Sequence, residues 1–338
     1  METLSTDVVI IGAGPTGLFA VFECGMLKIS SVLIDALDEL GGQCVALYPE
    51  KPIYDIPAYP SIEGGELINQ LEKQIAPFNT PKLLGRKVVA IEGEAGHFTV
   101  RTNIGDEIAA KAIIIAAGAG AFGPNRPPLD GLSEYEATGA VRYYVKRRED
   151  LRDQRVVIAG GGDSAVDWAL ALQGIARSIA VVHRRPKFRA APESAAQLDA
   201  LAANGKVEMV IPYQLHALHG VEGQLTHVEV ADLEGNTKRL EADVLLPFFG
   251  LAMELGPIAA WGLDLAKTHI QVDHATMQTS RPGMFAIGDV ATYPGKLKLI
   301  LQGFAEGAVA AHAIYTIVNP DKALHFEYST SKGVQAAP

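Results

Sequence analysis

The chain contains 338 residues, with a formal net charge of -10 and two cysteines. This length is too great for one ordinary core and suits two domains. The acidic balance argues against nonspecific nucleic-acid binding, and two cysteines cannot form a disulfide framework. No apolar run reaches the roughly 20 residues of a membrane span, and the first residues lack the basic segment typical of a signal peptide. We therefore expect a cytoplasmic protein with no membrane and no nucleic-acid partner.

The first predicted element is a buried strand at residues 8–11, which leads into the glycine-rich sequence GAGPTG and then into a helical pattern. In dinucleotide-binding folds, the first glycine of such a loop permits a tight turn. The second lets the backbone approach the pyrophosphate, and the third allows close packing of helix on strand. Gly12, Gly14 and Gly17 occupy these positions. The following strand ends on Asp35, where a carboxylate accepts hydrogen bonds from a ribose 2′-hydroxyl.

A second fingerprint follows later in the chain. A buried strand and a glycine turn close the first unit at residues 111–118, and the breaker-rich sequence GPNRPP forms a linker. Another apolar strand then leads into GGGDSA at residues 160–165. Gly160, Gly162 and Ala165 occupy the three positions of the first loop. The chain is therefore predicted to hold two nucleotides.

The two units differ at the charged position that ends the second strand. His183 stands where the first unit has Asp35, and Arg184 and Arg185 follow it. Arginines at this point match a 2′-phosphate, so FAD for the first unit and NADPH for the second are the natural pair. A basic run is often only a solvated surface. The location of this one, directly after a second-strand pattern, favours phosphate binding.

The chain then returns to its first unit. The second unit ends on a buried strand at residues 242–247, and a further strand ends on Gly-Asp at residues 288–289. A long alanine-rich helix is predicted over residues 299–317. These elements predict an α/β protein with two Rossmann-like dinucleotide-binding domains, the second inserted into the first. The expected FAD-binding domain is discontinuous and the NADPH-binding domain is continuous, with boundaries at residues 1–122 and 250–338 for the first and 123–249 for the second.

Over nearly its full length the chain resembles the low-molecular-weight thioredoxin-reductase-like flavoproteins. Within them it is most similar to the thioredoxin-reductase-type ferredoxin–NADP(+) reductases. The motifs that carry the resemblance are GAGPTG at 12–17, GGQ at 41–43, ALYPEK at 46–51, GGGDSAVDW at 160–168, HRRPKFRA at 183–190, FAIGD at 285–289 and YPGKLKL at 293–299. The resemblance implies a thioredoxin-reductase-like fold, FAD and NADP(H) as cofactors, and a homodimer.

The resemblance also implies which residues bind FAD, and the second fingerprint with its basic segment indicates those that bind NADPH. The FAD set is Gly12, Gly14, Thr16, Gly17, Asp35, Gln43, Tyr48, Val88, Phe122, Asp289, Tyr328 and Thr330. The NADPH set is Gly160, Gly162, Asp163, Ser164, Ala165, His183, Arg184, Arg185 and Arg189.

Within the FAD set, Tyr48 and Tyr328 would stack on the isoalloxazine, Tyr328 from the partner subunit. The helix that begins near Leu299 would point its positive end at flavin N1–C2=O. Apolar burial alone favours the core for Val88 and Phe122, so their contacts rest on the resemblance. No metal and no catalytic acid or base is expected, because the cofactor carries the chemistry.

The positions of the cysteines distinguish disulfide reductases from flavoproteins that pass electrons on directly. A thioredoxin reductase needs a Cys-x-x-Cys pair before its second fingerprint, and residues 139–147 contain no cysteine. A related class that reduces low-molecular-weight disulfides carries a cysteine inside the first glycine loop, where this chain has Thr16. Cys24 and Cys44 read as buried small residues, although Cys44 is close to the expected flavin site.

Without a dithiol, the flavin passes its electrons directly to a one-electron carrier. The resemblance then implies a ferredoxin–NADP(+) reductase, with hydride transfer between NADP(H) and N5 of FAD and one-electron exchange with ferredoxin or flavodoxin. An NADPH-dependent disulfide or quinone reductase that recruits Cys44 stays open, as does an FAD/NADPH-binding sensor without turnover. Two basic clusters either steer an acidic carrier or form salt-bridged surface: Arg142, Lys146, Arg147, Arg148, Arg152 and Arg155, and Lys296 with Lys298.

Overall fold

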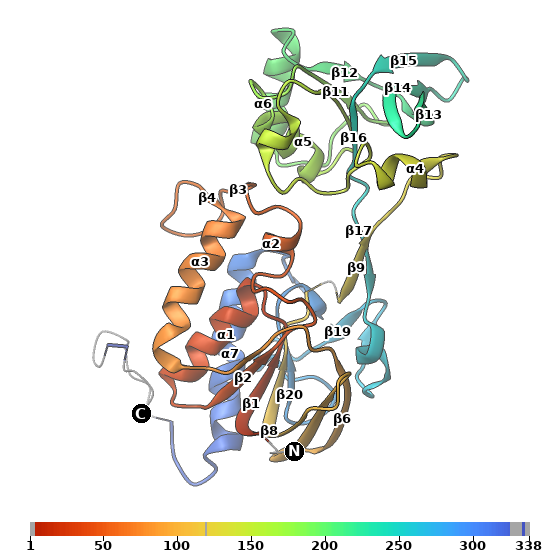
Figure 1. Cartoon of the computed structure of the whole chain (residues 1–338). Helices are drawn as coiled ribbons and strands as arrows, with labels where there is room; N and C mark the ends of the chain where they lie inside the picture. The colour runs from red at the N-terminus through yellow and green to blue at the C-terminus, as the bar shows by residue number, and fades with distance from the viewer. Residues whose placement is uncertain (1–3, 119, 325–332, 335–338) are drawn as a thin grey trace. The chain divides into compact units, whose positions relative to one another are not determined.

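The computed structural model describes residues 4–118, 120–324 and 333–334. Its contacts divide the chain into two compact units. Residues 1–122 and 253–338 form the first unit, and residues 123–252 form the second (Figure 1). The two connecting segments, β9 (Ala121–Pro124) and β17 (Leu251–Glu254), pair with each other as a two-stranded sheet.

A seven-stranded sheet forms the centre of the first unit. Its strands are β1 (Leu4–Ile11), β2 (Ser31–Ile34), β5 (Lys82–Leu83), β6 (Val88–Glu94), β7 (His97–Thr102), β8 (Glu107–Ile115) and β20 (Met284–Ala286). β1 lies between β2 and β8 and is parallel to both, and β20 adds to β8, also in parallel. Because parallel strands end at one edge, the segments that follow β1, β2, β8 and β20 come together there.

The two faces of this sheet have different covers, which explains the unbroken apolar run in β1. On one face, Val8 and Ile10 pack with apolar residues of three helices: α1 (Pro15–Met26), α3 (Gly64–Ile75) and α7 (Ile300–Val318). Figure 1 shows these helices along the same side of the sheet. On the other face, Val9 and Ile11 pack with apolar residues of the 255–291 segment.

Short elements complete the first unit. They are α2 (Gln43–Ala46), β3 (Pro52–Ile53), β4 (Ile62–Glu63), β18 (Leu265–Ala266), β19 (His269–Gln271), β21 (Ala291–Thr292) and the 3-10 helices η1 (Ala76–Phe78), η3 (Gly256–Ala260) and η4 (Gly288–Val290). Within the described part of the chain, no helix is long and apolar enough to span a bilayer.

The second unit repeats the strand–loop–helix–strand arrangement on a smaller scale. Its parallel sheet has the order β12-β11-β10-β16, and an antiparallel sheet has the order β13-β14-β15. These strands are β10 (Arg155–Ala159), β11 (Ser178–Val182), β12 (Glu208–Val210), β13 (Gln214–Val221), β14 (Gln224–Ala231), β15 (Thr237–Glu241) and β16 (Val244–Pro247). The helices are α4 (Leu132–Ala137), α5 (Asp163–Ala171), α6 (Pro192–Ala203) and the 3-10 helix η2 (Arg148–Leu151).

Candidate functional site

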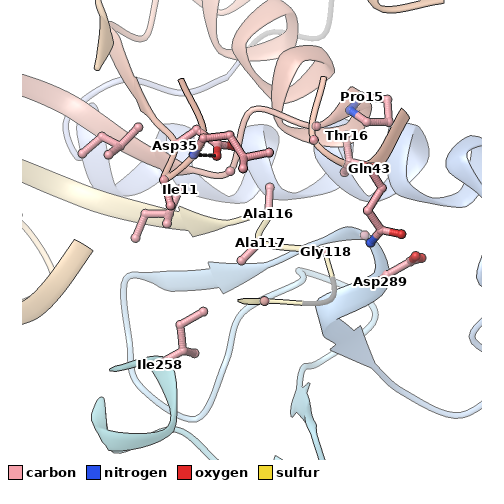
Figure 2. Close-up of a pocket in the computed structure, with 18 of the residues that line it drawn as sticks. Ile11, Pro15, Thr16, Asp35, Gln43, Ala116, Ala117, Gly118, Ile258 and Asp289 are labelled. Carbon is pink, nitrogen blue, oxygen red and sulfur yellow. Dashed lines mark hydrogen bonds between the residues drawn. The ribbon is translucent and has the colours of Figure 1, made fainter. Parts of the chain in front are cut away.

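A cavity of about 530 Å³ opens at the carboxyl edge of the first unit's sheet (Figure 2). This volume lies within the range of small-molecule sites. Among the residues that line it are eight of the FAD set expected from the sequence: Gly12, Gly14, Thr16, Asp35, Gln43, Tyr48, Val88 and Asp289. Gly17 does not line the cavity, nothing is described of the Phe122 side chain, and Tyr328 and Thr330 lie outside the described residues.

The three glycines of the first loop have distinct surroundings. A Cβ on Gly12 would lie 2.3 Å from the Ala116 carbonyl oxygen, and Gly12 also has a φ of +112° that side chains rarely adopt. A Cβ on Gly17 would lie 1.8 Å from the Gly12 carbonyl oxygen. A Cβ on Gly14 would meet nothing within 4 Å. Gly12 and Gly17 are therefore needed for packing, whereas Gly14 leaves space open at the start of α1.

Asp35 is held by the backbone around it. Its carboxylate accepts hydrogen bonds from the N–H groups of Ala13, at 2.5 Å, and Leu37, at 2.8 Å. Burial raises the pKa of Asp35, and these N–H groups counteract part of that rise. Figure 2 shows Asp35 beside Ile11, where the glycine loop leaves β1. The side chain lines the cavity as a fixed acceptor close to the start of α1.

A second polar region of the cavity lies away from Asp35. Figure 2 shows the Gln43 side chain extending toward Gly118 and Asp289. Gln43 begins α2, and Asp289 belongs to η4. The start of α7 lines the same cavity through Leu299 and Ile300. The free N–H groups at a helix start carry partial positive charge, so this end of the cavity suits a ligand with acceptor atoms.

Tyr48 and Cys44 form an apolar part of the wall. The Cys44 sulfur lies 3.9 Å from the Tyr48 hydroxyl oxygen, and both residues line the cavity. Burial raises the pKa of the Cys44 thiol to about 11 and places the pKa of Tyr48 well above its usual value. Cys24 lies in the core, where burial raises its thiol pKa to about 12. Both thiols are therefore protonated at neutral pH and are weak nucleophiles.

Part of the lining was not anticipated from the sequence. Arg86 and Lys87 line the cavity beside Val88, and Leu255, Ile258 and Trp261 line it from η3 and its flanks. The apolar residues are at least 238 positions from the glycine loop in sequence, and no local motif marks them. The Trp261 indole N–H is buried and has no hydrogen-bond partner among the described residues.

The second glycine loop has a similar geometry. A Cβ on Gly160 would lie 2.8 Å from the Phe248 carbonyl oxygen, and one on Gly162 would meet nothing within 4 Å. α5 begins at Asp163, with Ser164 exposed and Ala165 buried. The Asp163 carboxylate accepts a hydrogen bond from the Ala191 N–H at 2.8 Å. Gly162 thus leaves an open helix start, as Gly14 does in the first unit.

His183 packs between the basic segment and the second glycine loop. Its side chain is only 7% exposed, and its ring stacks on Phe188 with centroids 5.0 Å apart. A Cβ on Gly161 would lie 2.0 Å from the His183 ring, so the ring fits only against a glycine. Burial lowers the pKa of His183, with a further contribution from the neighbouring arginines, so the ring is neutral at pH 7. The residue that replaces the first unit's carboxylate is therefore packed inside the loop.

The arginines of this segment are exposed. Within the described residues, Arg184, Arg185 and Arg189 form no ion pair with a carboxylate. Arg185 and Arg189 line a shallow surface groove with residues 186–188. The Arg189 N–H donates to the Gly161 carbonyl at 2.7 Å, which joins the basic segment to the glycine loop. The exposed basic segment thus lies beside the second glycine loop.

The basic clusters considered for carrier docking are largely occupied by carboxylates. Lys296 corrects one expectation, because its side chain is 6% exposed and pairs with Glu306 inside the first unit. In the second unit, Arg152 pairs with Glu149 at 2.6 Å, and Arg155 pairs with Asp243 at 2.5 Å. The structure favours salt-bridged surface for these arginines and removes Lys296 from any docking surface.

Comparisons with known proteins agree with this architecture. The model of the family described as pyridine nucleotide-disulphide oxidoreductase matches residues 6–312. Among solved structures, thioredoxin reductase from T. acidophilum superimposes with a TM-score of 0.81 at 25% identity, covering 92% of this chain and 98% of that one. Thioredoxin reductase from Lactococcus lactis gives 0.81 at 26% identity, covering 93% and 99%. The expected thioredoxin-reductase-like α/β fold is confirmed.

Curated relatives are closer in sequence. The ferredoxin–NADP reductase of Acidiphilium cryptum is 74% identical over 333 residues, covering 98% of both chains. The protein of the same name from Granulibacter bethesdensis is 69% identical over 331 residues, covering 98% of this chain and 95% of that one. The chain therefore belongs to the pyridine nucleotide-disulphide oxidoreductase family, within its group of ferredoxin–NADP reductases.

Proposed function

We propose that this chain is a ferredoxin–NADP(+) reductase that holds FAD in the cavity of the first unit and NADP(H) on the second. One observation carries the assignment. Each unit has a glycine loop that leaves an open helix start, but the residues beside the two loops carry opposite charges. Asp35 lies beside the first loop, and Arg184 with Arg185 lies beside the second. A carboxylate selects a free ribose and arginines select a 2′-phosphate. The name of the curated relatives supports the same pairing.

The described residues fit FAD along the whole cavity. The open space at Gly14 and the start of α1 suits the pyrophosphate, and the Asp35 carboxylate suits the adenosine ribose. The backbone of Val88 would lie beside the adenine. When bound, FAD supplies the chemistry of the reaction, because it accepts a hydride at N5 and releases single electrons.

The second polar region of the cavity, which contains Gln43 and Asp289, would bind the flavin end of FAD. Gln43 and Asp289 would bind polar groups of the flavin and the ribityl chain, and Tyr48 would cover one face of the ring. The partial positive charge at the start of α7 would face N1–C2=O and favour the reduced, anionic ring. No side chain needs to transfer a proton in the hydride step.

The second unit would bind NADPH through its own loop. Gly160, Gly162 and the start of α5, with Asp163, Ser164 and Ala165, would receive the pyrophosphate. Arg184, Arg185 and Arg189 would bind the 2′-phosphate through charge-assisted hydrogen bonds. His183 would not contact the phosphate but would stabilise the conformation of the glycine loop by packing against Gly161.

The thiols argue against the disulfide-reductase alternative. Cys24 and Cys44 are both buried and protonated, and at positions 24 and 44 they do not form a Cys-x-x-Cys pair. Electrons therefore leave by direct transfer to a one-electron carrier. We propose ferredoxin as this carrier and flavodoxin as a second one, and we propose a homodimer that works in the cytoplasm.

The function is tested by stopped-flow reduction with NADPH, followed by transfer to purified ferredoxin and flavodoxin. We expect rapid bleaching of the flavin absorbance by NADPH and catalytic reduction of ferredoxin. Reduction of ferricyanide alone, without transfer to either carrier, would favour a quinone-type reductase. Absence of reduction by NADPH would favour a nucleotide-binding sensor.

Replacing both cysteines is expected to leave the reaction nearly intact. Cys24→Ala with Cys44→Ala removes two small buried groups and no thiolate, because burial holds both thiols protonated. NADPH-to-ferredoxin transfer should stay within a few-fold of the wild type, once flavin content shows that the variant is folded. A loss above roughly a hundredfold, about 2.7 kcal/mol of barrier, would return a redox role to the thiol.

Removing the tail after Glu327 tests the proposed cover of the flavin. Tyr328 and Thr330 would shield the ring face opposite Tyr48, whereas the ribose and pyrophosphate contacts lie in the first unit's cavity. The truncated protein should retain FAD but show altered flavin absorbance and fluorescence and a changed rate of hydride transfer. An unchanged spectrum with unchanged kinetics would rule out the cover.

A further inference from the structure

A buried ion pair lies behind the flavin end of the cavity. Glu306, in the second turn of α7, has a side chain that is 1% exposed, and the Lys296 side chain is 6% exposed. The Glu306 carboxylate accepts a hydrogen bond from the Gly288 N–H at 2.7 Å and from the Tyr293 hydroxyl at 2.6 Å. It also accepts one from the Lys296 ammonium. Gln302 donates to the Tyr293 oxygen at 2.8 Å, which completes the network.

Stability alone is a poor explanation for such a pair. Burying two charges costs desolvation free energy, and a well-packed apolar pair of similar size is often equally stable. Burial and Glu306 raise the pKa of Tyr293 to about 12, so this hydroxyl remains a neutral donor. The carboxylate is therefore satisfied by three donors that come from outside its own helix. The three donors fix the orientation of the Glu306 carboxylate, and the carboxylate in turn fixes the positions of the three donors.

The donors belong to the segments that line the cavity, although Glu306 itself is not among the lining residues. Gly288 directly precedes Asp289, and both belong to η4. Lys296 leads into Lys298, Leu299 and Ile300, which line the cavity at the start of α7. One side chain thus ties the Asp289 segment and the chain entering α7 to the same helix.

We propose that Glu306 is a positioning residue for the flavin end of the cavity, and that Lys296 is its required counter-charge. This proposal rests on FAD occupying the cavity. Glu306 holds the Gly288 N–H so that Asp289 faces the ribityl chain, and it holds the Tyr293 hydroxyl so that the start of α7 faces the ring, while Lys296 neutralises its charge. Because the pair is neutral overall, the partial charge of the helix start acts on the flavin without a competing net charge.

Three variants test the proposal in the full-length holoprotein. Glu306→Gln leaves the buried Lys296 ammonium without its counter-charge, and Lys296→Met leaves the buried Glu306 carboxylate without its counter-charge. Each single change should raise the FAD dissociation constant at least tenfold and shift the flavin absorbance and midpoint potential. The double change removes both charges, and the introduced amide carbonyl still accepts a hydrogen bond from the Gly288 N–H. It should restore FAD affinity to within threefold of the wild type.

An exposed pair in the same unit provides the matched control. Lys82 and Glu72 are joined at 2.7 Å with side chains 32% and 48% exposed, away from the cavity lining. Glu72→Gln should leave FAD affinity, absorbance and potential unchanged. The proposal is overturned if Glu306→Gln behaves like this control, or if the double variant loses as much affinity as the single ones. These readouts need no electron carrier, so a failure with ferredoxin would contradict the proposed function and leave this result standing.

Discussion

Gly14→Ala is expected to produce a folded protein that has lost its FAD. Gly14 has φ −68° and ψ 178°, which alanine adopts freely, and an added Cβ meets no protein atom within 4 Å. The new methyl group would instead occupy the space through which the backbone approaches the pyrophosphate. The FAD dissociation constant should rise at least a hundredfold, about 2.7 kcal/mol. Fluorescence titration of the apoprotein with FAD measures this change directly.

The neighbouring glycines provide the contrast for this prediction. Alanine at Gly12 would place a Cβ 2.3 Å from the Ala116 carbonyl oxygen, and alanine at Gly17 would place one 1.8 Å from the Gly12 carbonyl oxygen. Both contacts are with backbone, so these variants should fail to fold or unfold at much lower temperature. The Gly14→Ala apoprotein should unfold within about 4 °C of the wild-type apoprotein, as for a change near 1 kcal/mol. Retention of FAD by Gly14→Ala would show that the loop does not bind the pyrophosphate.

The glycine loops and their strands could be predicted because their signals are local. In each unit an apolar strand, a glycine loop and a charged segment follow one another closely, over residues 8–35 in the first and 156–185 in the second. The parallel register then brings the charged position beside the loop: Ile11 pairs with Ile34, and Ala159 pairs with Val182. Asp35 and the basic segment are therefore close to their loops in space as well as in sequence. The long helix, predicted over residues 299–317, also lies within one residue of α7.

The parts that could not be predicted depend on contacts between distant segments. Trp261 and its apolar neighbours enter the cavity because the 255–291 segment packs on the face of the sheet opposite α1. Lys296 resembles a surface charge in the sequence, since nothing in YPGKLKL shows that a carboxylate in the following helix will bury it. His183 stands at the position of a ligand-binding carboxylate, yet its ring fills the space that Gly161 leaves. For Lys296 and His183, the residue type indicated a polar role, but packing against distant segments determined where each side chain lies.

Arg184→Ala is expected to weaken NADPH selectively. The Arg184 and Arg185 side chains are exposed beside the second glycine loop and have no carboxylate partner among the described residues. A charge-assisted hydrogen bond to a phosphate is worth roughly 1.5–3 kcal/mol, so the KM for NADPH should rise at least tenfold. Replacing both arginines should raise it at least a hundredfold. NADH has no 2′-phosphate, so its KM should change little in either variant.

Arg152→Ala separates this effect from a general loss of positive charge. Arg152 lies in the same unit and is also exposed, but its guanidinium is paired with Glu149. Its loss should leave the KM for both coenzymes within twofold. Steady-state ferricyanide reduction over a range of NADPH and NADH concentrations gives the KM and kcat for both coenzymes in each variant. Equal weakening of NADPH and NADH by Arg184→Ala would contradict a 2′-phosphate site. Selective weakening would show that two similar nucleotide folds in one chain are distinguished by the charge that follows their second strands.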